Sequence, residues 1–111
     1  MDSVIADEDD VAISAVTAAE LLVGVEMATP RRRERRRQFV DAVLGAIPVE
    51  DYDLAVARAH ARLLAEVSRE GRPRGAHDLI IAATAVSTNR VVVTDDDSGF
   101  VGLSGVEVRS V

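Results

Sequence analysis

The chain has 111 residues, 13 basic and 19 acidic side chains, a formal net charge of -6 and no cysteine. This length, with 48% hydrophobic residues, predicts one domain over residues 1–111 and excludes disulfides, thiolate metal sites and a cysteine nucleophile. All basic residues are arginine, and the absence of lysine excludes a P-loop and Schiff-base chemistry. No apolar run approaches the roughly 20 residues of a membrane span, so a cytoplasmic protein without membrane contact is expected.

The first predicted elements are a strand and a helix. Residues 11–14 (VAIS) are short, partly β-branched and preceded by an acidic turn, which indicates a buried strand. Thr17 and Glu20 have the spacing of a capping box, so a helix should begin there, with Glu20 in its first turn. Pro30 should end this helix or open the next one.

The middle of the chain is rich in arginine. Residues 31–44 run from six arginines into an apolar stripe, which predicts a helix with a solvated first half and a packed second half. Gly45 should close this helix, and residues 46–49 (AIPV) are expected to form a short edge strand.

The second half of the chain predicts two helices and two strands. Asp53 and Gly71 bracket the most regular apolar spacing, which is typical of a helix with polar ends. The expected elements are helices over residues 53–70 and 76–88 and strands over residues 90–94 and 106–108. Strands separated by helices predict an α/β fold with a parallel sheet that helices cover on both sides.

Carboxylates follow two of the predicted strands. Glu20 comes after VAIS, Asp78 opens its helix, and residues 95–97 (DDD) come after VVVT. Ligands of open parallel sheets bind beyond the carboxyl ends of the strands, so these acids are expected to converge. Clustered carboxylates raise one another's pKa unless a cation compensates, and oxygen ligands alone favour Mg²⁺ or Mn²⁺. Such ions polarise phosphates and acidify an attacking water, which indicates phosphodiester hydrolysis.

Each acid also has a plain structural explanation. Glu20 can complete a capping box, Asp78 can complement a helix dipole, and residues 95–97 can form a solvated turn. A plain α/β scaffold therefore stays open beside the nuclease hypothesis.

Three segments then match a known family. Residues 13–26 (ISAVTAAELLVGVE), 71–85 (GRPRGAHDLIIAATA) and 91–100 (VVVTDDDSGF) resemble the PIN-domain ribonucleases, and specifically the VapC-type toxins, from about Val11 to the end of the chain. The resemblance implies a three-layer αβα sandwich, a Mg²⁺-dependent endoribonuclease, RNA as substrate, a VapB-type antitoxin as partner and a homodimer. It places Glu20, Asp78 and Asp96 at the family's metal-binding and catalytic acids.

One part of the family pattern has no counterpart. The resembling proteins begin with a central strand that ends in a metal-binding aspartate, and residues 2–5 (DSVI) match it only faintly. We therefore expect an amino-terminally truncated domain that lacks its first, central strand, with two inner strand edges unpaired. The alternative function is a catalytically inactive PIN-like module that only binds an antitoxin.

Arginines supply the expected contacts to RNA. Arg72 and Arg74 lie close in sequence to Asp78 and are expected to bind phosphate. The run from Arg31 to Arg37 carries a local charge of +5 (six arginines against Glu34) and is either a phosphate-binding patch or a solvated helix face.

Overall fold

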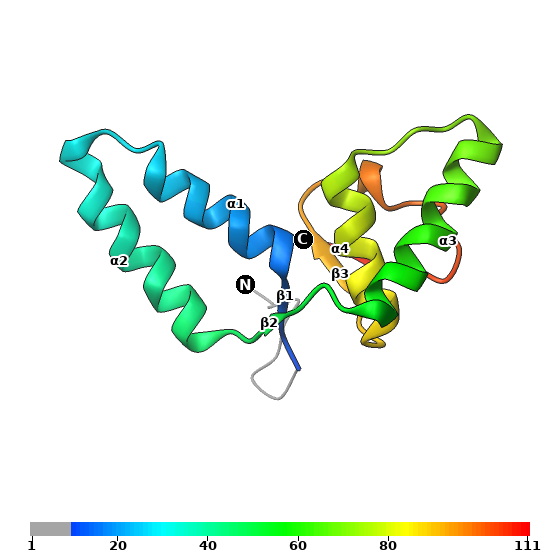
Figure 1. The fold of residues 1–111 in the computed structure, drawn as a ribbon, viewed down its shortest axis with the longest axis horizontal. Helices are drawn as coiled ribbons and strands as arrows, with labels where there is room; N and C mark the ends of the chain where they lie inside the picture. Colours follow the sequence, from blue (N-terminus) through cyan, green and yellow to red (C-terminus); the bar gives the residue numbers. More distant parts are fainter. Residues whose placement is uncertain (1–9) are drawn as a thin grey trace. The chain divides into compact units, whose positions relative to one another are not determined.

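The computed structural model describes residues 10–111, which divide into two compact units (Figure 1). We call residues 10–51 the amino-terminal unit and residues 52–111 the carboxy-terminal unit. The expectation of a single domain over residues 1–111 stays a prediction, and the DSVI segment lies outside the described residues. No helix within residues 10–111 is long and apolar enough to span a bilayer.

The amino-terminal unit is a helical hairpin closed by a pair of short strands. Its elements are β1 (Ile13–Ser14), α1 (Ala15–Glu26), α2 (Pro30–Ala46) and β2 (Val49–Glu50). The two helices lie side by side and antiparallel (Figure 1), and β1 pairs with β2 in parallel. Apolar side chains that the helices bury, Val25 of α1 and Val40 of α2, belong to the core of this unit.

The start of α1 differs from the prediction. Ser14, not Thr17, caps the helix, because its Oγ accepts a hydrogen bond from the backbone N–H of Thr17 at 3.1 Å and the helix begins at Ala15. The predicted capping box is therefore wrong, and Glu20 lies in the second turn of α1 rather than the first. The predicted strand is also shorter, since only Ile13 and Ser14 are paired.

Helix α2 begins as predicted and ends later. Pro30 occupies the first turn, where its missing N–H costs no hydrogen bond. Gly45 does not close the helix: the chain stays helical to Ala46, and the backbone N–H of Ile47 still donates to the carbonyl of Val43 at 2.9 Å. The strand expected over residues 46–49 is correspondingly displaced to Val49–Glu50.

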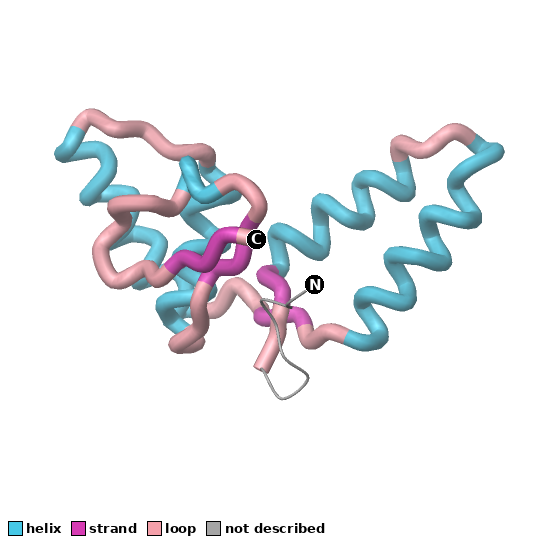
Figure 2. Tube along the Cα trace, turned by 180° about the vertical axis from the view of Figure 1, so that it is seen from behind, coloured by secondary structure: helices cyan, strands magenta, loops and turns pink. Residues whose placement is uncertain are grey.

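The carboxy-terminal unit packs two helices with a second parallel strand pair (Figure 2). Its elements are α3 (Leu54–Glu70), α4 (Ala76–Ser87), β3 (Val92–Thr94), the short 3₁₀ helix η1 (Asp97–Gly99) and β4 (Val108–Ser110). Leu63 of α3 and Leu79 of α4 are 0% and 2% exposed and form the centre of its core. Burying a leucine stabilises the fold by about 1.5–3 kcal/mol. The packing of α3 against α4 therefore fixes the position of the residues at the amino end of α4.

Helix α3 has the ends that its sequence predicts. Asp53 Oδ1 accepts a hydrogen bond from the backbone N–H of Val56 at 3.0 Å, and Gly71 adopts the left-handed conformation with φ 66° at the carboxyl end. A residue with a Cβ would be strained at that φ, so glycine is the residue that lets the chain turn towards α4.

The two carboxy-terminal strands are shorter than expected. Strand β3 covers only Val92–Thr94 of residues 90–94, and the side chain of Val93 is exposed. The last strand lies at Val108–Ser110 instead of residues 106–108. Within residues 10–111 the strands form two separate parallel pairs, β1 with β2 and β3 with β4, together with four α-helices, which confirms the α/β class with parallel strands.

Candidate active site

Asp78 is fixed at the amino end of α4. The helix starts at Ala76, so Asp78 lies in its first turn, where a carboxylate is stabilised by the positive end of the helix dipole. The next residue, Leu79, is buried in the core and anchors this turn. The position predicted for Asp78 is therefore confirmed, and its half-buried carboxylate is held by a rigid element.

The carboxylate of Asp78 rests against the turn that follows β3. A methyl group placed on Gly99 would lie 2.2 Å from Asp78 Oδ2 and 2.8 Å from its Cγ, so a residue with a side chain fits at that position only if the Asp78 side chain or the turn shifts. Gly99 ends η1, which begins at Asp97, the last residue of the acidic run 95–97. Two motifs that are distant in sequence thus meet in the carboxy-terminal unit.

Asp96 is ordered by local hydrogen bonds. Its backbone N–H donates to Thr94 Oγ1 at 3.1 Å, and its Oδ1 accepts from the backbone N–H of Ser98 at 3.1 Å. Hydrogen bonding from the side chain of Ser98, and next from that N–H, lowers the pKa of the Asp96 carboxyl. Asp96 is therefore ionised at neutral pH, as a metal ligand must be.

Asp97 has a partner on the neighbouring strand. Ser110 Oγ donates to Asp97 Oδ2 at 3.2 Å, and the backbone N–H of Val111 donates to the carbonyl of Thr94 at 3.0 Å. The end of β4 therefore braces the start of η1, and Asp97 contributes to the turn's structure.

Arg74 ties the loop before α4 to the same turn. Its Nη1 donates to the carbonyl of Ser98 at 3.2 Å and its Nη2 to the carbonyl of Val101 at 2.8 Å. These two bonds could not be predicted from local sequence patterns, because Arg74 and its acceptors are 24 and 27 residues apart. Arg72, two residues earlier, is exposed.

Asp78 is the open acid of this arrangement. Within residues 10–111 its carboxylate has neither a hydrogen-bond partner nor an ion-pair partner, in contrast to Asp96 and Asp97. The unpartnered carboxylate of Asp78 lies at the start of a helix and contacts the turn that carries the ionised Asp96. Carboxylate oxygens in this arrangement are suitable ligands for a hard divalent cation.

The third predicted acid belongs to the other unit. Glu20 is exposed on α1, and its convergence with Asp78 and Asp96 stays a prediction. In the part of the chain that the structure describes, no group of three or more histidine, aspartate or glutamate side chains is arranged to hold a metal ion.

Known proteins share both the sequence pattern and the fold. The PIN domain family matches residues 2–103. The tRNA(fMet)-specific endonuclease VapC of Shigella flexneri is 34% identical over 97 residues, which are 87% of this chain and 72% of that protein. Ribonuclease VapC5 of Mycobacterium tuberculosis is 40% identical over 100 residues, or 87% of this chain and 71% of that one.

The structural neighbours agree with the sequence relatives. A crystal structure of DNA-bound VapBC from Salmonella typhimurium superposes with a TM-score of 0.83 at 32% identity, over 89% of this chain and 74% of that one. The predicted PIN-type αβα fold is thereby confirmed. Sequence match and fold together establish that the chain belongs to the PIN-domain family, among its VapC-type members.

Proposed function

We propose that the chain is a Mg²⁺-dependent endoribonuclease, the toxin of a type II toxin–antitoxin pair. The observation that carries the proposal is the unpartnered carboxylate of Asp78, held against Gly99 in the turn that also presents Asp96. The relatives support it, since they are named ribonucleases or endonucleases.

Asp78, Asp96 and Glu20 are the residues that would hold the ion, directly or through its waters. Asp78 offers both oxygens, and Asp96 has one oxygen occupied by the Ser98 N–H, which leaves its second without a partner within residues 10–111. Carboxylate oxygens alone suit a hard divalent cation, and Mg²⁺ is the proposed one, with Mn²⁺ as the close substitute. When bound, such an ion supplies a Lewis acid for the phosphate and an acidified water for the attack.

The arginines beside Asp78 have different roles in this proposal. Arg74 already donates to two carbonyls, so its main effect is to hold the turn, although a guanidinium has further N–H groups for a phosphate. Arg72 is exposed in the same loop and is the better candidate for contact with an RNA phosphate.

The partner that we propose is a VapB-type antitoxin. Structural neighbours from Salmonella typhimurium and Rickettsia felis are VapBC complexes bound to DNA, and the Mycobacterium tuberculosis neighbour is also a VapBC member. The homodimer that the family resemblance implies stays a prediction.

Asp78→Asn tests the proposal, because it keeps the shape of the side chain and removes its charge. We expect ribonuclease activity in Mg²⁺ to fall by at least about 100-fold, as for loss of one electrostatic group in an active site. We also expect Mg²⁺ to raise the melting temperature of the unmodified chain, by an amount equivalent to about 2.7 kcal/mol at 100 times the Kd, but not that of the variant.

Glu107→Gln is the matched control. Glu107 is exposed and lies at the amino ends of β3 and β4, where its carbonyl accepts from the backbone N–H of Val92, whereas Asp96 follows the carboxyl end of β3. This variant should keep both activity and the Mg²⁺ effect. Full activity of Asp78→Asn would refute the site. A chain that binds a VapB-type antitoxin, without cleavage and without any Mg²⁺ effect, would instead be the non-catalytic module.

A further inference from the structure

The amino-terminal half of α2 concentrates positive charge in an acidic protein. Residues 31–37 hold six arginines and one glutamate, which gives +5 locally, whereas the whole chain carries -6. The structure separates these arginines into two groups by what their guanidinium groups contact.

Three of the arginines have contacts within the hairpin. Arg33 Nη2 donates to the carbonyl of Ala28 at 3.1 Å, at the turn between α1 and α2. Arg36 Nη1 lies 3.6 Å from the position of a methyl group on Gly24, so its side chain lies along α1. Arg37 forms an exposed ion pair with Glu34 at 2.9 Å. These contacts account for Arg33, Arg36 and Arg37.

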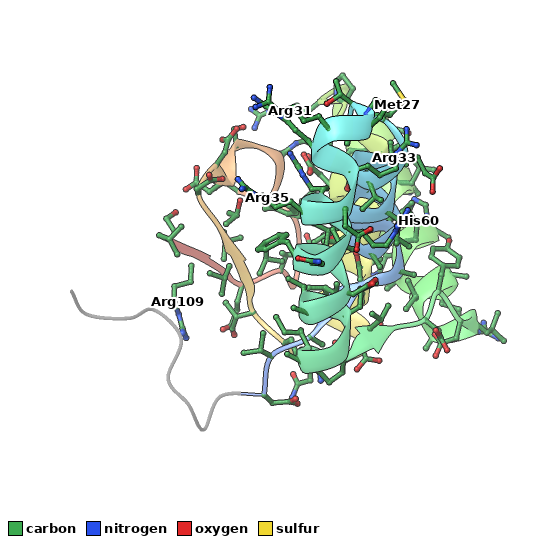
Figure 3. The ribbon with its side chains drawn as sticks, turned by 90° about the vertical axis from the view of Figure 1, so that its left-hand side faces the viewer. Met27, Arg31, Arg33, Arg35, His60 and Arg109 are labelled. Carbon is green, nitrogen blue, oxygen red and sulfur yellow. The ribbon has the colours of Figure 1, made fainter. Side chains whose placement is uncertain are left out.

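The other three arginines have no such contacts. Arg31, Arg32 and Arg35 are exposed, and within residues 10–111 none of them makes a hydrogen bond or an ion pair. Figure 3 shows Arg31 and Arg35 on one side of α2 and Arg33 on the other. Arg31 and Arg35 therefore lie on a different side of α2 from Arg33, which contacts the turn between α1 and α2.

Helix stability does not account for these three arginines. Cations near the amino end of a helix oppose the helix dipole, and α2 has no acidic residue in its first turn. Arg31 and Arg35 are also one turn apart, a spacing at which like charges repel each other. The positive charges of these three arginines therefore lower the stability of α2, and a bound anionic ligand would offset that loss.

An exposed aromatic side chain follows these arginines on α2. Phe39 is four residues after Arg35 and 61% exposed, and it is one of several exposed apolar side chains of the hairpin, together with Leu22, Val23 and Met27. Proteins bind single-stranded nucleic acids with this combination of positive charge and an exposed aromatic ring: the arginines contact the phosphates, and a base stacks on the ring. An acidic peptide without apolar side chains would use the charges but not the ring.

We propose that Arg31, Arg32, Arg35 and Phe39 form a docking stripe for single-stranded RNA. The proposal rests on the ribonuclease function proposed above and names a substrate-binding surface for it. The arginines hold the backbone by its phosphates without reading the sequence, and the ring sets the position of one base.

The test measures binding of a fluorescein-labelled oligouridine to the full chain in EDTA, so that no cleavage occurs. The variant Arg31→Gln/Arg32→Gln/Arg35→Gln removes three phosphate contacts, which lowers the slope of log affinity against log salt by about 2, at roughly 0.7 per contact for single strands. Between about 50 and 200 mM salt the unmodified chain should therefore lose about 20-fold more affinity than the variant. Lysine at the same three positions should restore most of the slope.

The matched control has the same change in net charge on α3. Arg58→Gln/Arg62→Gln/Arg69→Gln removes three exposed arginines of that helix and should leave the slope as it is. Equal effects of the two triple variants would show that only net charge matters and would overturn the stripe. An unchanged slope in the α2 variant, including one accompanied by loss of antitoxin binding, would overturn it as well.

Phe39→Leu tests the base-stacking part. Leucine keeps an apolar helix-forming side chain and removes the ring, so RNA affinity should fall at least about fivefold with the salt slope unchanged. Unaltered affinity would remove Phe39 from the stripe. The ribonuclease proposal can fail independently of the stripe. A chain that binds oligouridine in EDTA but cleaves no RNA in Mg²⁺ would refute the ribonuclease function and leave the RNA-binding stripe supported.

Discussion

The contact between Gly99 and Asp78 predicts a large effect from adding one methyl group. In Gly99→Ala the new Cβ would lie 2.2 Å from Asp78 Oδ2, and ordinary van der Waals contact begins at 3.4 Å, so the carboxylate must retreat by about 1.2 Å (3.4 minus 2.2). Asp78 cannot retreat with its helix, because Leu79 is buried beside it. The side chain must therefore change its rotamer or the turn must move.

Either response has a cost in stability and in activity. Overpacking of this kind lowers the free energy of unfolding by about 1–3 kcal/mol, and a misplacement of about 1 Å at a reacting group can reduce the rate by about 100-fold. Urea denaturation and initial rates of RNA cleavage in Mg²⁺ measure the two effects. Gly45→Ala is the control for the exchange itself: nothing lies within 4 Å of its new methyl group, and alanine in helix α2 should stabilise by about 0.5–1 kcal/mol.

A double-mutant cycle assigns the effect to the contact. Asp78→Ala removes the Oδ2 and Cγ atoms that the methyl group would meet, so Gly99→Ala should lose most of its stability cost in that background. Additive effects of the two changes, or a Gly99→Ala variant with the stability and activity of the unmodified chain, would refute the close approach.

Three further changes test the supports of the carboxy-terminal unit. Arg74→Gln removes two N–H donors from carbonyls of the turn, so the free energy of unfolding should fall by about 1–2 kcal/mol in urea denaturation, and an unaffected midpoint would contradict the tie. Hydrogen bonds from Ser104, first from its side chain and then from its backbone N–H, lower the pKa of Glu66 below its ordinary 4.5. The contribution of ionised Glu66 to the stability of the fold is therefore complete above pH 4.5 and is lost as the pH falls through the folded-state pKa. Urea midpoints of the unmodified chain and Glu66→Gln should therefore converge in acid, and a gap that widens there would reverse the sign. Asp53→Ala removes the cap of α3 and should cost about 1 kcal/mol in thermal unfolding, whereas Asp53→Asn should cost far less.

The helices could be predicted because their signals are local. Asp53 and Gly71 mark the ends of α3 by chemistry that acts within one turn, and the structure confirms both. The same logic was wrong at α1, where two hydroxyls three residues apart compete for the cap. Ser14 is the cap because pairing with β2 holds it in the extended conformation (ψ 158°) from which its Oγ reaches the N–H of Thr17.

The strands and the site depend on distant parts of the chain. The last strand begins at Val108 rather than at residue 106 because β3 sets its register, with Val92 opposite Val108 and the Val92 N–H donating to the carbonyl of Glu107. No local pattern encodes that choice. The contact of Gly99 with Asp78 has the same origin, and a glycine after an acidic run is its only trace in the sequence.

The proposed RNA stripe concentrates positive charge in a chain whose net charge is negative. Carboxylates that hold a cation repel an RNA backbone until the ion is bound, and the net charge of -6 adds to that repulsion. Salt confines the field of a charge to a Debye length of about 8 Å at physiological ionic strength, so a local excess of arginine on one helix can attract phosphate in a chain with negative net charge. In the proposed stripe, Arg31, Arg32 and Arg35 supply this local excess, and within residues 10–111 none of their guanidinium groups is paired. Spreading the same three charges over the surface would preserve the net charge and lose the salt-dependent binding.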